Sequence, residues 1–157
     1  MSQENPIPKP DGYQMQDWQE YYDADDLKWD LGEVSPPLKR LWEEGRLRPG
    51  KTLVPGCGQG HEVLFFAERE FEMTGVDYAP GAVERLSAHL KASGLNASVI
   101  QSNFFELGEE HTGFYDAVLE QTCFCAIRPR DRVRYVDTVC RVLKPGGVLA
   151  GLFYETG

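Results

Sequence analysis

The chain has 157 residues, which is enough for one domain with a hydrophobic core of its own. Its 25 acidic side chains outnumber 16 basic ones, so the formal net charge is −9 and the protein would repel a nucleic-acid backbone. The sequence has no run of about 18 apolar residues and no signal-peptide pattern, so we expect no membrane partner and a cytoplasmic location.

Residues 1–33 predict an irregular N-terminal arm, followed by a main domain at residues 34–157. The arm is polar, and its large anchors are Trp18, Tyr21, Tyr22 and Trp29. A short amphipathic helix follows the arm. Ser35 is expected to cap this helix, Pro36 lies in its first turn, and Gly45 ends it.

From Thr52 onwards, apolar strands alternate with amphipathic helices. The predicted strands cover residues 52–55, 71–77, 98–101, 115–120 and 148–154. The predicted helices run through residues 63–67, from 82 to about 94, and from about 130 to 143, and a turn at 144–147 precedes the last strand. This alternation predicts an α/β, Rossmann-like fold with a mostly parallel central sheet and helices on both faces.

The last of these helices carries both apolar and basic side chains. We expect its core-facing side to consist of Val133, Val136, Cys140 and Leu143. The arginines at positions 128, 130, 132 and 134 scatter around a helix, so they do not predict a nucleic-acid surface.

A glycine-rich loop directly follows the first strand and opens the next helix. Its spacing is G-x-G-x-G at Gly56, Gly58 and Gly60, whereas dinucleotide-binding loops read G-x-G-x-x-G. The loop therefore favours a nucleoside ligand over the pyrophosphate of a nicotinamide cofactor. We expect the adjoining His61 to be an exposed first-turn residue rather than a catalytic one.

An acid ends the second strand, 17 residues beyond the last glycine of the loop. A carboxylate at this position of the fold accepts the ribose hydroxyls of a nucleoside cofactor, so Asp77 and the adjoining Tyr78 are candidate binding residues. Alternatively, Asp77 only caps the helix that starts near Pro80.

Asn103 and Phe104 follow the third strand, where this fold meets adenine. The Asn103 side chain could accept a hydrogen bond from the adenine amine while Phe104 packs on the ring. In the alternative, Asn103 is a turn residue and Phe104 belongs to the core.

The four cysteines lack the paired C-x-x-C spacing of a zinc site, so we expect free thiols, at least two of them in the core, and no metal.

Five segments together carry a family resemblance. They are Trp18-Gln-Glu-Tyr-Tyr22, Lys28-Trp-Asp-Leu-Gly32, Ser35-Pro-Pro-Leu38, Leu53-Val-Pro-Gly-Cys-Gly-Gln-Gly60 and Glu120-Gln-Thr-Cys-Phe-Cys-Ala-Ile127. On these segments the chain resembles the thiopurine S-methyltransferase family, especially its thiol and halide methyltransferase branch. The resemblance covers roughly residues 15 to 154 and implies a class I methyltransferase that uses S-adenosylmethionine and releases S-adenosylhomocysteine.

The resemblance also implies where the cofactor is bound. Family members enclose it with two aromatic residues of the arm, eleven apart, which Trp18 and Trp29 match. An indole face attracts a sulfonium cation, although both tryptophans could instead only attach the arm to the domain. The complete set of expected cofactor contacts is Trp18, Tyr22, Trp29, Gly56, Cys57, Gly58, Gly60, Asp77, Tyr78, Asn103, Phe104, Glu120 and Gln121.

Two departures from the family bear on the methyl acceptor. Gln121 stands where relatives carry tyrosine or arginine, and it is our acceptor-side candidate. Family members also continue past the fifth strand into an antiparallel hairpin, whereas this chain stops at Gly157. We therefore expect either a truncated product or a chain in which something else replaces the hairpin, and without a replacement the fifth strand would have an exposed edge.

The expected reaction is methyl transfer from S-adenosylmethionine to a small soft nucleophile, a thiol or alternatively a thiopurine or halide. A thiolate is nucleophilic without a strong base, in keeping with a sequence that lacks an evident catalytic dyad. The alternative is a module that binds the cofactor without turnover. Enzymes that methylate amino groups of nucleic acid carry an Asp/Asn-Pro-Pro-aromatic motif, which is absent from Glu120-Gln-Thr-Cys123. We expect a monomer that acts on small molecules.

Overall fold

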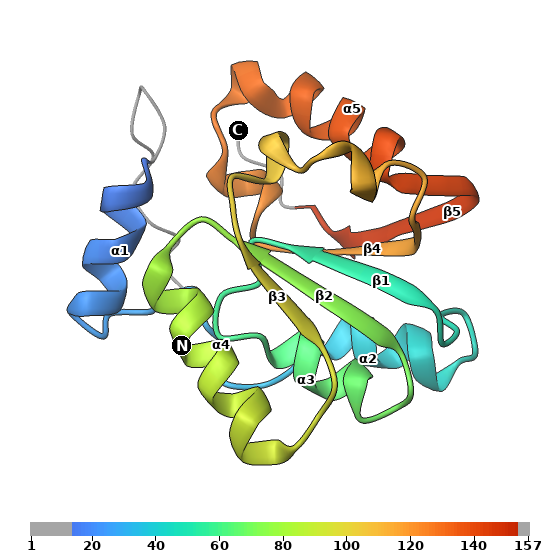
Figure 1. Cartoon of the computed structure of the whole chain (residues 1–157), viewed down its shortest axis with the longest axis horizontal. Helices are drawn as coiled ribbons and strands as arrows, with labels where there is room; N and C mark the ends of the chain where they lie inside the picture. The colour runs from blue at the N-terminus through green and yellow to red at the C-terminus, as the bar shows by residue number, and fades with distance from the viewer. Residues whose placement is uncertain (1–13, 154–157) are drawn as a thin grey trace.

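A computed structural model describes residues 14–153 and contains a parallel five-stranded sheet with the order β3-β2-β1-β4-β5 (Figure 1). The strands are β1 (Lys51–Pro55), β2 (Glu72–Asp77), β3 (Ser98–Gln101), β4 (Tyr115–Gln121) and β5 (Leu143–Leu152). The order reverses between β1 and β4, so the carboxyl ends of these two strands flank the switch point where ligands bind on such sheets.

The helices cover both faces of the sheet (Figure 1). They are α1 (Met15–Asp23), α2 (Pro36–Glu43), α3 (His61–Ala67), α4 (Pro80–Ser93) and α5 (Arg132–Val142). Side chains of α2, α3 and α4 share one buried cluster with the sheet, and those of α5 share another. The predicted Rossmann-like α/β fold is confirmed.

The two clusters follow from the alternation of side chains along the strands. Val54 of β1 and Leu119 of β4 face α2, α3 and α4, while their neighbours Leu53 and Val118 face α5. Successive strand residues point to opposite faces, and strands with helices on both sides are therefore apolar throughout.

The predicted core face of α5 is wrong. Val133 is 71% exposed and Val136 is 49% exposed, and Cys140 is also exposed. The buried residues of α5 are instead Tyr135, Thr138, Val139 and Val142. Both sets have helical spacing, and the buried set includes a tyrosine whose hydroxyl donates to Glu120 Oε1 at 3.1 Å. This bond satisfies the polar hydroxyl of Tyr135, so the tyrosine ring can be buried.

Three local predictions also need correction. The arm, predicted to be irregular, contains the nine-residue helix α1 (Met15–Asp23). Ser35 occupies the N-cap of α2, but its side chain makes no capping hydrogen bond, and its backbone N–H donates to Glu62 Oε1 at 3.0 Å. The predicted turn at 144–147 lies within the bounds of β5, as an irregularity. Leu143 pairs with Tyr115 and Val148 pairs with Ala117. Residues 144–147 of β5 therefore lie opposite a single residue of β4, Asp116.

The two edge strands of the described sheet are β3 and β5, and on β5 Val148 and Leu149 are 48% and 39% exposed. Within residues 14–153, no helix is both long and apolar enough to cross a bilayer.

Candidate functional site

The glycine loop leaves β1 at the switch point and turns through three left-handed residues. The φ angles are +58° at Gly56, +56° at Gly58 and +81° at Gly60, a region that side chains other than glycine rarely adopt. The Cys57 N–H donates to Val76 O at 3.0 Å, which ties the loop to the end of β2.

The three glycines meet different surroundings. A Cβ on Gly60 would lie 2.3 Å from Leu86 of α4, and one on Gly56 would lie 3.0 Å from Cys123. At Gly58, the nearest neighbour of such a Cβ is the Tyr22 hydroxyl, at 3.4 Å. Close packing therefore requires Gly60 and Gly56, and Gly58 is the loop position with the most open surroundings.

Asp77 lies at the carboxyl end of β2 and points at the glycine loop. Its Oδ2 accepts the Gly58 N–H and its Oδ1 accepts the Ala79 N–H, both at 2.9 Å. Burial raises the pKa of Asp77, and these backbone hydrogen bonds oppose the rise. The carboxylate thus faces the loop and makes a local turn with Ala79, the N-cap residue of α4, which has no side-chain cap hydrogen bond. The ribose contact of Asp77 stays a prediction. The Tyr78 N–H is a third backbone donor to Asp77. Since a carboxylate has about four lone-pair sites, roughly one remains for a ligand.

The residues after β3 are placed as in the structural alternative. Asn103 Oδ1 accepts the Phe105 N–H at 3.0 Å and caps a short 3₁₀ helix, Phe104–Glu106. Phe104 is 8% exposed and packs on Tyr135 at a centroid distance of 5.3 Å. Contact of these residues with adenine stays a prediction. Tyr78 is half-buried and directly follows Asp77 at the end of β2.

The aromatic residues of the arm gather around one indole. The ring of Trp29 lies edge-on to Trp18 and Tyr21, at 5.4 Å from each, and 6.0 Å from Tyr22. Tyr22 is buried, and a Cβ on Gly81 would lie 2.6 Å from its Cβ, so α1 packs closely on the start of α4. Trp18 and Trp29 therefore attach the arm to the domain, and Trp29 also lines a pocket.

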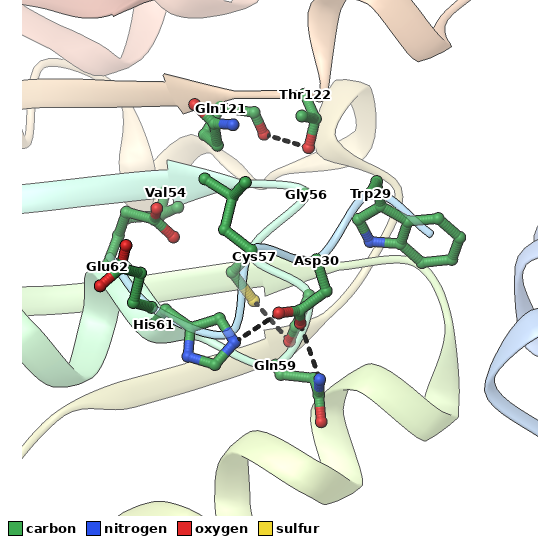
Figure 2. A pocket seen from close by; sticks show the side chains of 13 residues that line it. Trp29, Asp30, Val54, Gly56, Cys57, Gln59, His61, Glu62, Gln121 and Thr122 are labelled. Atoms are coloured by element: carbon green, nitrogen blue, oxygen red, sulfur yellow. Dashed lines mark hydrogen bonds and ion pairs between the residues drawn. The ribbon is translucent and has the colours of Figure 1, made fainter. Parts of the chain in front are cut away.

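That pocket lies between the arm, the glycine loop and the end of β4 (Figure 2). The arm contributes Trp29, Asp30, Leu31 and Glu33; β1, the loop and α3 contribute Val54, Gly56, Cys57, Gly58, Gln59, His61 and Glu62; and β4 with its following loop contributes Gln121 and Thr122. Of the expected cofactor contacts, the pocket unites the arm indole, the first two loop glycines, Cys57 and Gln121.

Sequence reasoning missed a hydrogen-bonded cluster in this pocket. The Asp30 carboxylate accepts from Gln59 Nε2 at 2.7 Å and from His61 Nε2 at 2.8 Å (Figure 2). It also accepts from Gly32 N at 2.6 Å. The hydrogen bonds from His61 and Gln59 hold the pKa of Asp30 at about 2 against burial, and the bond to Asp30 raises the pKa of His61. The expectation of an exposed His61 is wrong, since its side chain is 24% exposed and paired. The acid in the Trp29-Asp-Leu-Gly32 motif was the available signal.

Glu120 and its neighbour Gln121 point in different directions. Glu120 is 0% exposed, and its Oε1 accepts from Phe124 N at 2.7 Å as well as from Tyr135. Burial raises the pKa of Glu120 to about 7. Its side chain therefore belongs to the core under α5. Gln121 instead lines the pocket, where its Oε1 is buried without a hydrogen-bond partner in the described residues.

Thr122 turns the chain at the end of β4. Its φ is +59°, an uncommon and costly conformation for a β-branched residue, and its Oγ1 donates to Gln121 O at 2.7 Å. Backbone outliers of this kind concentrate at ligand sites, which favours a functional role for this end of β4.

No cluster of three or more metal-ligating side chains occurs in the part of the chain that the structure describes. The four cysteines are free; Cys57 is buried, Cys123 and Cys125 are half-buried, and Cys140 is exposed, so the expectation of at least two in the core holds fully only for Cys57.

Solved structures with the same fold include methyltransferases. A 1,6-didemethyltoxoflavin-N1-methyltransferase of Burkholderia thailandensis, solved with S-adenosylhomocysteine, matches with a TM-score of 0.74 and 22% identity over 98% of this chain and 68% of its own. A structure from work on the conversion of a disulfide bond into a thioacetal group in echinomycin biosynthesis matches with a TM-score of 0.80 and 22% identity, over 87% and 59% of the two chains.

Sequence comparison gives the family. A probable thiol methyltransferase of Arabidopsis thaliana is 32% identical over 139 residues, which cover 87% of this chain and 61% of the relative. A thiopurine S-methyltransferase of Nitrosospira multiformis is 27% identical, over 82% and 64% of the two chains. The chain thus spans about three fifths of the length of these relatives. The family model for thiopurine S-methyltransferase matches residues 13–156. With this match over nearly its whole length, the chain belongs to the thiopurine S-methyltransferase family.

Proposed function

We propose that this chain binds S-adenosylmethionine at the glycine loop and transfers its methyl group to a small soft nucleophile, a thiol. The observation that carries the proposal is the position of Asp77. Its carboxylate lies within hydrogen-bond distance of Gly58 in the loop, at the sheet edge where nucleosides bind, and it keeps acceptor capacity for a ribose hydroxyl.

The residues at the other end of the loop suit the amino-acid part of the same cofactor. Gln121 Oε1 is a buried acceptor without a partner in the described residues, and an ammonium group would satisfy it. The pocket also contains the acids Asp30, Glu33 and Glu62, and neither lysine nor arginine is among its lining residues. This acidic lining without lysine or arginine favours a ligand with positive charge.

Trp29 supports the choice of a sulfonium cofactor. Its indole forms part of the pocket wall, and Trp18 and Tyr21 hold it edge-on. A cation near an indole face gains about 0.5–2 kcal/mol, more as water is excluded.

When bound, S-adenosylmethionine would supply an electrophilic methyl carbon: its bond to the acceptor sulfur forms as its bond to the sulfonium breaks, and the electron pair stays on S-adenosylhomocysteine. The chain's contribution is then alignment and exclusion of water, which can supply up to roughly 7–11 kcal/mol. The acceptor thiol, with a pKa near about 8.5, can lose its proton to solvent, so this chemistry needs no strong base from the protein.

The test has two measurements on the same purified chain. Calorimetry should show binding of S-adenosylmethionine, and incubation with methyl-labelled cofactor and a panel of thiols, thiopurines and halides should show labelled product with a thiol. Binding without transfer to any acceptor would refute the enzymatic proposal in favour of a cofactor-binding module. Absence of binding would refute both.

The same proposal includes a monomer in the cytoplasm. The free thiols fit a reducing compartment, because paired cysteines are typical of oxidising ones. Size-exclusion chromatography with light scattering tests the monomer, and fractionation of cells expressing the native protein tests the location.

A further inference from the structure

A cluster of three side chains joins the N-terminal arm to the glycine loop. We name it the Asp30 clasp, after its acceptor, and it consists of Asp30, Gln59 and His61 (Figure 2). Asp30 Oδ2 accepts from Gln59, and Oδ1 accepts from both His61 and the Gly32 N–H. The Asp30 side chain is 11% exposed, so hydrogen bonds from Gln59, His61 and the Gly32 N–H replace most of its contacts with water.

The clasp is continued on its far side by Arg85 of α4. Gln59 Oε1 accepts from Arg85 Nη1 at 3.3 Å, and Arg85 also donates to Asp25 Oδ1 at 2.8 Å and to Tyr22 O at 2.9 Å. The arm is thus held on both sides of Trp29: Arg85 binds the end of α1, and the clasp binds the residue directly after the indole.

The position of Trp29 depends on these attachments. The indole is half-buried, and its aromatic neighbours Trp18, Tyr21 and Tyr22 belong to the arm itself. Packing within the arm therefore fixes Trp29 relative to α1. Trp29 also packs against the cluster of Tyr22, Ala79 and Ala82, and the clasp adds a direct attachment of the residue after Trp29 to the glycine loop.

We infer that Asp30 is a positioning residue for the proposed cofactor site, one that acts through Gln59 and His61 to hold Trp29 over the glycine loop. The inference rests on the proposed function for its consequence, cofactor affinity. The attachment itself can be tested without any ligand.

The clasp also has an electrostatic component that changes with pH. Asp30 is ionised throughout the physiological range, since its pKa is about 2, and the pKa of His61 is raised. Glu62 of α3 and Glu33 of the arm face the same pocket, and Arg85 reaches the clasp through Gln59. The ion pair is complete below the ordinary pKa of histidine, about 6.5, and is lost as pH rises through the raised value.

The principal variant is Asp30→Asn. Asparagine keeps the size of the side chain but offers only one acceptor oxygen to the three donors. Its NH₂ group would then face an N–H donor in place of an acceptor. Gln59 can turn its own oxygen toward that amide only by giving up Arg85. The matched control is Asp116→Asn, which removes an exposed carboxylate away from the pocket. Asp116 also accepts two hydrogen bonds, one from the Lys51 backbone N–H and one from the Lys144 side chain.

The first measurement uses the ligand-free chain. Acrylamide quenching of tryptophan emission is measured for each variant and for the same variant that also carries Trp29→Phe. The difference between the two measurements reports the Trp29 indole. Asp30→Asn should make Trp29 more accessible to quencher, and Asp116→Asn should leave it unchanged. Circular dichroism checks that each variant is folded. Equal quenching of Trp29 in a folded Asp30→Asn variant and the parent would overturn the inference.

The second measurement is calorimetric titration with S-adenosylmethionine. Asp30→Asn should raise the dissociation constant about tenfold or more, the scale of one lost charge-assisted hydrogen bond. His61→Gln keeps a donor for Asp30 but cannot titrate, so quenching of Trp29 in this variant should be equal at pH 6 and pH 9. In the parent chain, quenching of Trp29 should increase from pH 6 to pH 9. Unchanged affinity in Asp30→Asn would overturn the positioning role. A parent chain that fails to bind cofactor would refute the proposed function, while the quenching comparison would still decide the attachment.

Discussion

Glu120 offers a prediction in which burial, charge and stability are linked. Its carboxyl is 0% exposed under α5, and its Oε1 accepts from Phe124 N and Tyr135 Oη, while Oε2 is buried without a partner in the described residues. Because burial raises the pKa of Glu120, the folded chain binds this proton more tightly than the unfolded chain does. The free energy of unfolding should therefore fall as pH rises from about 4.5 to about 7.

The magnitude follows from the two pKa values. A pKa that rises from 4.5 to about 7 corresponds to a cost of about 3 kcal/mol once the carboxyl is fully ionised, and to under about 1 kcal/mol at pH 5. Glu120→Gln keeps an acceptor oxygen for Phe124 and Tyr135 but carries no charge. Relative to this variant, the parent should lose about 2–3 kcal/mol between pH 5 and pH 8.

Urea unfolding of both chains at pH 5, 6, 7 and 8 measures this difference. His61, Glu62 and Asp77 also have raised pKa values and lower the stability of both chains in the same direction, so only the difference between the two curves reports Glu120. Parallel curves across this range would refute a buried, titrating Glu120.

Three further predictions concern the site and the core. Asp77→Ala should weaken S-adenosylmethionine binding by roughly 1.5–3 kcal/mol, the scale of a charged hydrogen bond; an unchanged dissociation constant in calorimetry would contradict the proposed ribose contact. Trp29→Ala should weaken binding of S-adenosylmethionine more than of the uncharged-sulfur product S-adenosylhomocysteine, and equal losses would exclude a cation–π contribution. Val139→Ala should cost about 2 kcal/mol of unfolding free energy, whereas Val136→Ala should cost less than about 0.5; similar costs in urea unfolding would contradict the observed face of α5.

The sequence alone predicted the order of strands and helices along the chain and the place of the candidate site in it. A loop with three glycines, an acid ending the second strand and helices at three of the four strand connections leave little choice of fold, because each feature is local and each reads directly from residue type. The observed bounds of β3, Ser98–Gln101, are the predicted ones. The position of Asp77 at the loop was also predictable, since neighbouring parallel strands end at the same edge.

Only the tertiary structure decided which face of α5 is buried. Val133 and Val136 have the spacing of a core stripe, as do Tyr135 and Val139, and sequence periodicity cannot choose between two such stripes. On the buried face, the Tyr135 hydroxyl donates to the Glu120 carboxyl, 15 residues away, and this contact exists only in the folded chain.

The Asp30 clasp was likewise beyond sequence reasoning, because Asp30 and His61 are 31 residues apart and their contact exists only when the arm folds back on the loop. The charge states of Glu120 and His61 follow the same rule. Residue type sets an ordinary pKa, but burial and the partner across the fold set the actual one, and both are properties of the packed structure.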